Sequence, residues 1–196
     1  MKKMPEINLE KYKVDFSGYK YSISFVGNPS FDNCLKILCE LVKVFSTKLN
    51  IFSEEKDFLQ SVEKIKEKNL LEEDDLQVYL KCKHDFIPEE EKIAQIYNSS
   101  KINLSISVKG KAFLKYQIFE ILASGGFLIT NEREDLKKYF EASRHLETYK
   151  NTNDLIDKID FYLKNLKIAR KIAQIGKFEV IKNYILSART KKRFKR

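Results

Sequence analysis

The sequence predicts an α/β domain of three layers, in which helices cover both faces of a mostly parallel sheet. Segments typical of strands and segments typical of helices alternate along most of the 196 residues. The strand segments are short and rich in apolar residues, as buried strands are, while the segments between them carry apolar residues at helical spacing. Such alternation implies right-handed crossovers and a ligand site beyond the carboxyl ends of the strands.

The first strand is expected at residues 21–26, where polar and apolar residues alternate and then give way to an apolar end. After a turn at 27–30, residues 31–45 predict a helix, since Leu35, Leu38, Leu41, Val42 and Phe45 follow helical spacing. The next expected elements are a strand at 48–52, an exposed helix or irregular connection at 54–75, a strand at 76–80 and a helix at 88–97.

The second half continues the alternation, and residues 102–108 alternate strictly between apolar and polar side chains. A glycine pair ends the helix that follows. The remaining expected elements are helices at 112–124, 131–140, 151–166 and 169–186, with strands at 127–130 and 145–149.

Length and composition favour one domain. A chain of 196 residues, 43% hydrophobic and with 14 Phe and 10 Tyr, can bury one sizeable core but is too short for two ordinary domains. We expect an N-terminal extension at 1–20, the domain at 21–186 and a basic tail at 187–196. No apolar run approaches the roughly 18 residues of a membrane span, and no signal-peptide core follows the start, so we expect a cytoplasmic protein.

The formal net charge of +9 favours anionic partners. Much of the excess lies at the chain ends, above all after residue 188, where a basic run is also typical of a solvated helix end. Because no nucleic-acid motif accompanies it, nucleic acid is the less favoured partner.

No metal or disulfide site is expected. Cys34, Cys39 and Cys82 are odd in number and lack CxxC spacing, which favours buried thiols. His84 and His145 are far apart and belong to no metal-binding motif.

Two segments are candidates for a ligand site. Gly27 and Asn28 begin the turn between the first strand and its helix, where backbone amides can face a phosphate, although an ordinary turn explains them too. In the second segment Glu120 lies within the most apolar helix, where a buried carboxylate needs hydrogen-bond donors. Ribose hydroxyls could be those donors, or Glu120 could face solvent.

The end of this helix and the loop before it belong to the same segment. Ser124, Gly125 and Gly126 let the backbone approach a base or a pyrophosphate closely, and a simple helix cap explains them equally well. Lys111, with Lys109 and Lys115, could neutralise a diphosphate as point charges.

A family resemblance rests on the segments YNSSKI from residue 97 and FEILASGGFLIT from residue 119. Further matching positions are Asp135, Leu136, Phe140, Tyr149, Asp154 and Leu155. The sequence resembles the C-terminal domain of GT-B glycosyltransferases, and within them the spore-maturation-protein-like subgroup. The resemblance covers roughly residues 21–193 and implies a Rossmann-like unit, a single GT-B half, that binds a nucleotide-sugar donor.

The resemblance also implies roles for these residues. Glu120 matches the acidic residue that holds the ribose, and Gly27 with Asn28 matches the diphosphate-side loop. Ser124, Gly125 and Gly126 match the segment that lines the nucleotide pocket. Glycosyl transfer in this family is implied to be metal-independent, with backbone amides and basic side chains stabilising the leaving group.

The chain departs from the family at two positions near the glutamate. Relatives often carry an arginine where this chain has Gln117, and many carry a second acidic residue where it has Ala112. A GT-B enzyme also places its acceptor site in an N-terminal domain, and only about twenty residues precede the first strand here.

Three functions follow in order of preference. The first is the donor-binding half of a glycosyltransferase, which works with a separately encoded N-terminal half. The second is a non-catalytic module of the same fold that binds a nucleotide or a protein, and the third is a basic nucleic-acid-binding protein.

Overall fold

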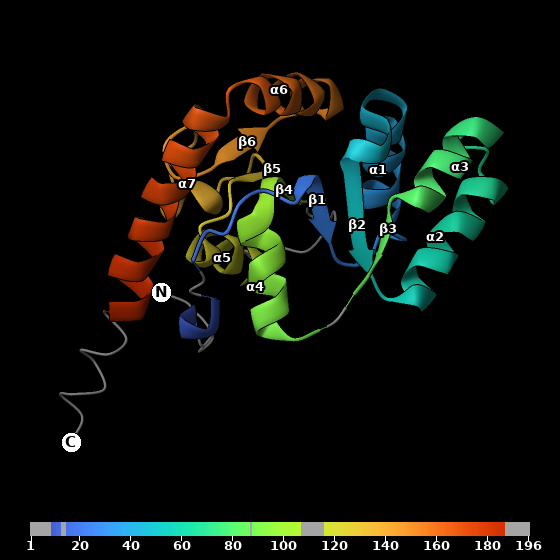
Figure 1. Ribbon diagram of the computed structural model, residues 1–196. Helices are drawn as coiled ribbons and strands as arrows, with labels where there is room; N and C mark the ends of the chain where they lie inside the picture. The colour runs from blue at the N-terminus through green and yellow to red at the C-terminus, as the bar shows by residue number, and fades with distance from the viewer. Residues whose placement is uncertain (1–8, 13–14, 87, 107–115, 187–196) are drawn as a thin grey trace.

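A computed structural model describes residues 9–12, 15–86, 88–106 and 116–186 of the chain. Its six strands form one sheet in the order β3-β2-β1-β4-β5-β6, and every neighbouring pair is parallel (Figure 1). The strands are β1 (Tyr21–Val26), β2 (Leu49–Ser53), β3 (Lys83–Asp85), β4 (Ser100–Ser105), β5 (Leu128–Asn131) and β6 (Glu147–Tyr149). The predicted mostly parallel sheet is therefore confirmed, and the order of its strands reverses between β1 and β4, which makes that pair the topological switch point.

Helices cover both faces of the sheet (Figure 1). The α-helices are α1 (Asp32–Phe45), α2 (Glu55–Glu67), α3 (Glu73–Lys81), α4 (Glu90–Ser99), α5 (Tyr116–Ser124), α6 (Thr152–Lys164) and α7 (Leu166–Val180). Short turns of other helix types are η1 (Leu9–Tyr12), η2 (Ser46–Lys48), η3 (Leu136–Lys138) and η4 (Ile181–Leu186). The three-layer architecture predicted from the sequence is confirmed.

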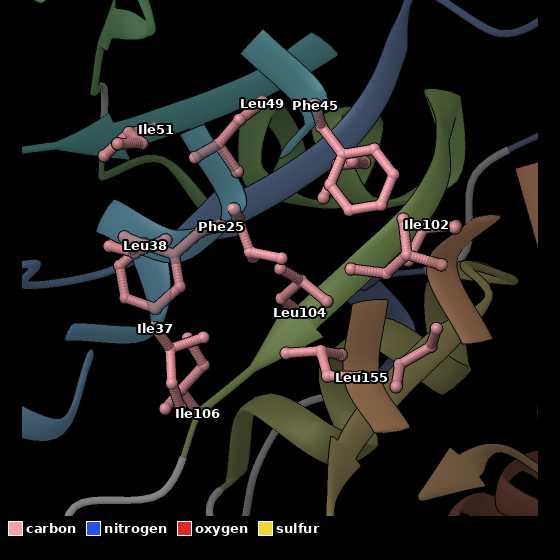
Figure 2. Close-up of a cluster of buried hydrophobic side chains, with 14 of the residues drawn as sticks. Phe25, Ile37, Leu38, Phe45, Leu49, Ile51, Ile102, Leu104, Ile106 and Leu155 are labelled. Carbon is pink, nitrogen blue, oxygen red and sulfur yellow. The ribbon is translucent and has the colours of Figure 1, made fainter. Parts of the chain in front are cut away.

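The larger core lies between the sheet and helices α1, α2, α3 and α6. Figure 2 shows its centre, where Phe25 and Leu104 of the sheet lie close to Leu38 of α1 and Leu155 of α6. Apolar residues at every second position of a strand point to one face, so these side chains form a continuous layer. Burial of this layer is the main force that holds α1 to the sheet.

The second core lies on the opposite face, between the sheet and helices α4 and α5, and η1 adds Tyr12 to it. Phe119 and Leu122 of α5 pack there against Leu128 of β5. Helix α7 contributes to both cores, with Ala173 in the first and Val180 in the second. The N-terminal segment is thus packed onto the domain rather than separate from it.

The predicted strand at 76–80 is wrong, because these residues belong to α3. Leu76, Val78 and Leu80 alternate like a strand, but the buried side chains are Leu76 and Tyr79, which lie three residues apart on one helix face. Acidic residues in the first turn of α3 stabilise the helix dipole. The third strand of the sheet is instead β3, a few residues later.

The predicted helix at 131–140 is also wrong, since only the single turn η3 forms there. Glu132 continues the strand pairing by donating its backbone N–H to Tyr149 O, 3.0 Å or less away at 2.8 Å. Arg133 then forms a bidentate ion pair with Asp135, with N···O distances of 2.9 and 2.6 Å. These local bonds compete with helical ones, while Leu136 and Phe140 anchor the segment in the second core.

The other expected elements form within a few residues of their predicted bounds. The exposed segment at 54–75 becomes α2 and the start of α3, joined by a turn. Expectations for residues 107–115 and for the basic tail at 187–196 fall outside the described residues.

Candidate functional site

The carboxyl ends of β1 and β4 meet at the switch point, where a ligand is expected in a doubly wound sheet. Gln117 of α5 joins the two strand ends, because its amide nitrogen donates to Val26 O at 2.7 Å and its oxygen accepts from Ser105 Oγ at 3.0 Å. Its nitrogen also lies 3.3 Å from the hydroxyl of the buried Tyr97. The residue that stands in place of an arginine is therefore fixed by bonds within the protein.

The turn after β1 lies at this same edge. Gly27 has φ +140°, a conformation that side-chain-bearing residues rarely adopt, and its N–H donates to Phe52 O of β2 at 3.0 Å. Asn28 Oδ1 accepts from the backbone N–H of Ser30 at 2.8 Å and lies 2.7 Å from the Ser30 hydroxyl. The Asn28 side chain thus stabilises the turn, which leaves the backbone as the surface that this loop offers to a ligand.

Glu120 lies one turn beyond Gln117 on α5 and is partly buried. Its Oε1 accepts a hydrogen bond of 3.1 Å from the hydroxyl of Tyr12 in η1. Burial raises the pKa of the Glu120 carboxyl above its ordinary value, the Tyr12 hydrogen bond opposes that rise, and the charge of Glu90 adds to it. Of the two alternatives left open by the sequence, simple exposure to solvent is excluded, because Glu120 has a protein donor and a partly buried position.

Tyr12 is held in place by its neighbours. Its ring is 4% exposed and belongs to the second core, and burial raises the pKa of its hydroxyl. The adjacent Lys11 forms an ion pair with Glu90 at the start of α4, with an N···O distance of 2.5 Å. Figure 1 shows η1, in dark blue, beside α4 and α5, so one polar group from outside residues 21–186 reaches the candidate site.

Ser124, Gly125 and Gly126 lie at the opposite, amino edge of the sheet, because α5 runs away from the switch point and leads into the start of β5. Gly125 donates to Leu122 O and Gly126 to Ile121 O, which is the hydrogen-bond pattern of a helix C-cap. The structure therefore does not bring these three residues together with Gly27 and Glu120. Contact between them and a nucleotide stays a prediction, and the cap already accounts for their presence.

An open hollow of about 400 Å³ lies at the ends of β5 and β6. Its lining consists of Asn131, Glu132, Arg133, Glu134, Tyr149 and Lys150. The hollow is at the same edge of the sheet as Gly27, and its one arginine is committed to Asp135. Lys111, the predicted diphosphate contact, lies outside the described residues.

The three cysteines are buried free thiols, as the sequence predicts. In the described parts of the chain, no three His, Cys, Asp or Glu side chains gather as a metal site would require. The helices described include none that is both long and apolar enough to cross a bilayer.

A doubly wound parallel sheet with a partly buried carboxylate near its switch point is a Rossmann-like domain of the kind that forms one half of GT-B glycosyltransferases. A family model described as glycosyl transferase-like matches residues 49–194, about three quarters of the sequence. The chain belongs to this glycosyl transferase-like family. No curated protein matches the sequence.

Solved structures support the fold. The chain is similar to the C-terminal domain of a group 1 glycosyl transferase (LpcC) from Francisella tularensis, with TM-score 0.63 and 16% identity, over 91% of this chain and 98% of that one. A glycosyltransferase from Rickettsia africae gives TM-score 0.63 and 18% identity, over 90% of this chain and 47% of the other. Sucrose-phosphate synthase from Thermosynechococcus elongatus gives 0.65 and 11%, over 96% and 50%. The chain thus spans one isolated domain, and about half the length of the longer relatives.

Sequence reasoning missed Tyr12 as a residue of the site. Tyr12 and Glu120 are 108 positions apart, and a polar segment without periodicity gives no sign of where it packs. A single signal was present: a tyrosine beside a lysine in a segment with no other reason to be aromatic.

Proposed function

We propose that this chain is the donor-binding half of a glycosyltransferase and that it holds a nucleotide-sugar at the carboxyl edge of its sheet. Glu120 is the observation that carries the proposal, since it is a partly buried carboxylate one turn from the switch point in a domain of the glycosyl transferase-like family. An ionised carboxylate in this position can accept hydrogen bonds from ribose hydroxyls. The turn at Gly27 offers backbone amides toward the diphosphate.

Several finer features belong to the same proposal. We place the chain in the spore-maturation-protein-like subgroup on the segment FEILASGG from residue 119. Transfer is proposed to need no metal ion, with amides and basic side chains stabilising the diphosphate that leaves. The acceptor site is proposed to lie on a separately encoded N-terminal half, because the chain spans about half the length of the longer relatives that it matches.

The first experiment measures thermal unfolding with and without a panel of nucleoside diphosphates and their sugar conjugates. A ligand that binds only the folded state raises the unfolding midpoint, by about 2.7 kcal/mol of stability when its concentration is a hundred times Kd. We expect one nucleotide to raise the midpoint of the wild type and to have little effect on Glu120→Ala. The exposed Glu63 of α2 provides a matched control, and Glu63→Ala should respond like the wild type.

A second candidate is a non-catalytic module of the same fold. Gln117 favours it, because a neutral side chain bonded to Val26 and Ser105 stands where relatives often carry a cation. If no nucleotide shifts the midpoint of the wild type, donor binding is contradicted and this second function becomes the better one.

A further inference from the structure

We propose that Tyr12 is a positioning residue for the donor site, whose hydroxyl orients the Glu120 carboxylate and leaves its second oxygen to the ribose. This inference rests on the proposed function, because it assigns a role toward the nucleotide that Glu120 is proposed to hold. It places an essential part of the site in the N-terminal segment, outside the residues that resemble the family.

The geometry fits such a role. The Tyr12 hydroxyl donates to Oε1 of Glu120 at 3.1 Å, and a carboxylate can accept several hydrogen bonds, so one donor on Oε1 leaves acceptor capacity on Oε2. Tyr12 is 4% exposed while Glu120 is only partly buried, so the hydroxyl approaches the carboxylate from the protein side. A ligand can then approach from the exposed side.

The segment that carries Tyr12 is anchored at three points. Lys11 pairs with Glu90 of α4, and Arg170 of α7 lies over the ring of Phe16 at 3.7 Å from its centroid. Lys20 donates its backbone N–H to Ser99 O at 2.8 Å, just before β1 begins. A tyrosine held in this way has little freedom to lose when a ligand binds, which is the advantage of a prearranged site.

The charged and titratable groups near Glu120 define its protonation. Among the described residues they are Tyr12 of η1, with Glu90 and Tyr97 of α4, and Lys11 acts on Glu90. Burial and Glu90 raise the pKa of Glu120, whereas the Tyr12 hydrogen bond lowers it. Because ribose hydroxyls need an ionised acceptor, Tyr12 also keeps Glu120 in the form that binds.

The experiment compares nucleotide binding by the full chain, as wild type, Tyr12→Phe and Tyr19→Phe, across a range of pH. Tyr12→Phe keeps the buried ring and removes only the hydroxyl, and Tyr19→Phe removes a hydroxyl from the same segment at a residue whose ring packs on Phe16. The probe is the nucleoside diphosphate that stabilises the wild type most.

We expect Tyr12→Phe to bind roughly tenfold more weakly at neutral pH, the usual scale for one hydrogen bond to a charged group. Removing the hydrogen bond also raises the pKa of Glu120, so the loss of binding at acid pH should begin at a higher pH than in the wild type. Tyr19→Phe should match the wild type in both respects.

The other outcomes separate the two proposals. Wild-type binding that Glu120→Ala abolishes and Tyr12→Phe leaves unchanged would overturn the role of Tyr12 and keep the proposed function. Weaker binding by Tyr12→Phe with an unmoved pH profile would overturn positioning and indicate packing alone. Absence of binding by the wild type would overturn both.

Discussion

At the scale of single residues, the molecule keeps a carboxylate where its ionised form is costly. Glu120 is partly buried, its pKa is raised by burial, and its one printed donor is Tyr12. A group with a raised folded-state pKa binds more protons in the folded state, so its contribution to stability is present at acid pH and is lost as pH rises through the folded pKa. Glu120 therefore lowers stability at neutral pH, which is a cost typical of ligand-binding residues.

This argument predicts that Glu120→Gln raises the unfolding midpoint at pH 7, on the order of 2 °C for a chain of this size. Glutamine keeps an oxygen that can accept from Tyr12 but carries no charge. The gain should shrink as pH falls below the ordinary pKa of a glutamate, because the wild type is then protonated as well. Calorimetry of both proteins at several pH values tests this, with Glu63→Gln as the control. A gain that does not depend on pH would contradict the electrostatic cause.

At the scale of elements, the close approach of α7 to α5 depends on Gly176. A Cβ at this position would overlap the carbonyl oxygen of His145 and lie 2.9 Å from Cδ2 of Leu122. Helix propensity alone favours Gly176→Ala by about 1 kcal/mol, while forcing atoms into a packed interface costs roughly 1 to 3 kcal/mol or more. Since one of the overlapped atoms belongs to the backbone and cannot rotate away, the steric cost should exceed the gain.

We therefore expect Gly176→Ala to lose about 2 kcal/mol and to unfold about 4 to 8 °C lower than the wild type. Gln174 lies exposed on the same helix, so Gln174→Ala tests the effect of alanine without the overlap and should change the midpoint little. A stabilised Gly176→Ala would mean that α7 can move away from α5 at little cost.

At the scale of the whole molecule, the N-terminal segment is part of the folded domain. Tyr12 is buried in the second core, and Phe16 lies under Arg170 of α7. The expected boundary at residue 21 is thus the start of the sheet but not the start of the packed structure.

This predicts a difference between two shortened chains, one that begins at Leu9 and one that begins at Gly18. Loss of the buried Tyr12 side chain alone should cost about 2 kcal/mol, so the chain from Gly18 should unfold several degrees lower than the chain from Leu9. Calorimetry of both proteins provides the measurement. Equal midpoints would show that η1 adds nothing to the stability of the domain.

The sequence by itself determined the fold class and most of the elements. Residues 21–26 and 31–45 carry periodicities that only one kind of element satisfies, and burial follows that periodicity in β1 and α1. Where two periodicities overlapped, as at 76–80, the burial of Tyr79 decided for a helix. At 131–140 the pairing of Glu132 with Tyr149 and of Arg133 with Asp135 outweighed helical preference.

The candidate site was predictable only in part. The sequence identified Gly27 as the residue of a special turn and Glu120 as a carboxylate in need of a donor, because both are local properties of the chain. Only the tertiary structure decided that the donor is Tyr12 and that Gln117 joins β1 to β4. It also placed Ser124, Gly125 and Gly126 at the other edge of the sheet. The physical reason is that periodicity records what each residue prefers around itself, whereas contacts across about a hundred residues depend on how the packed elements meet.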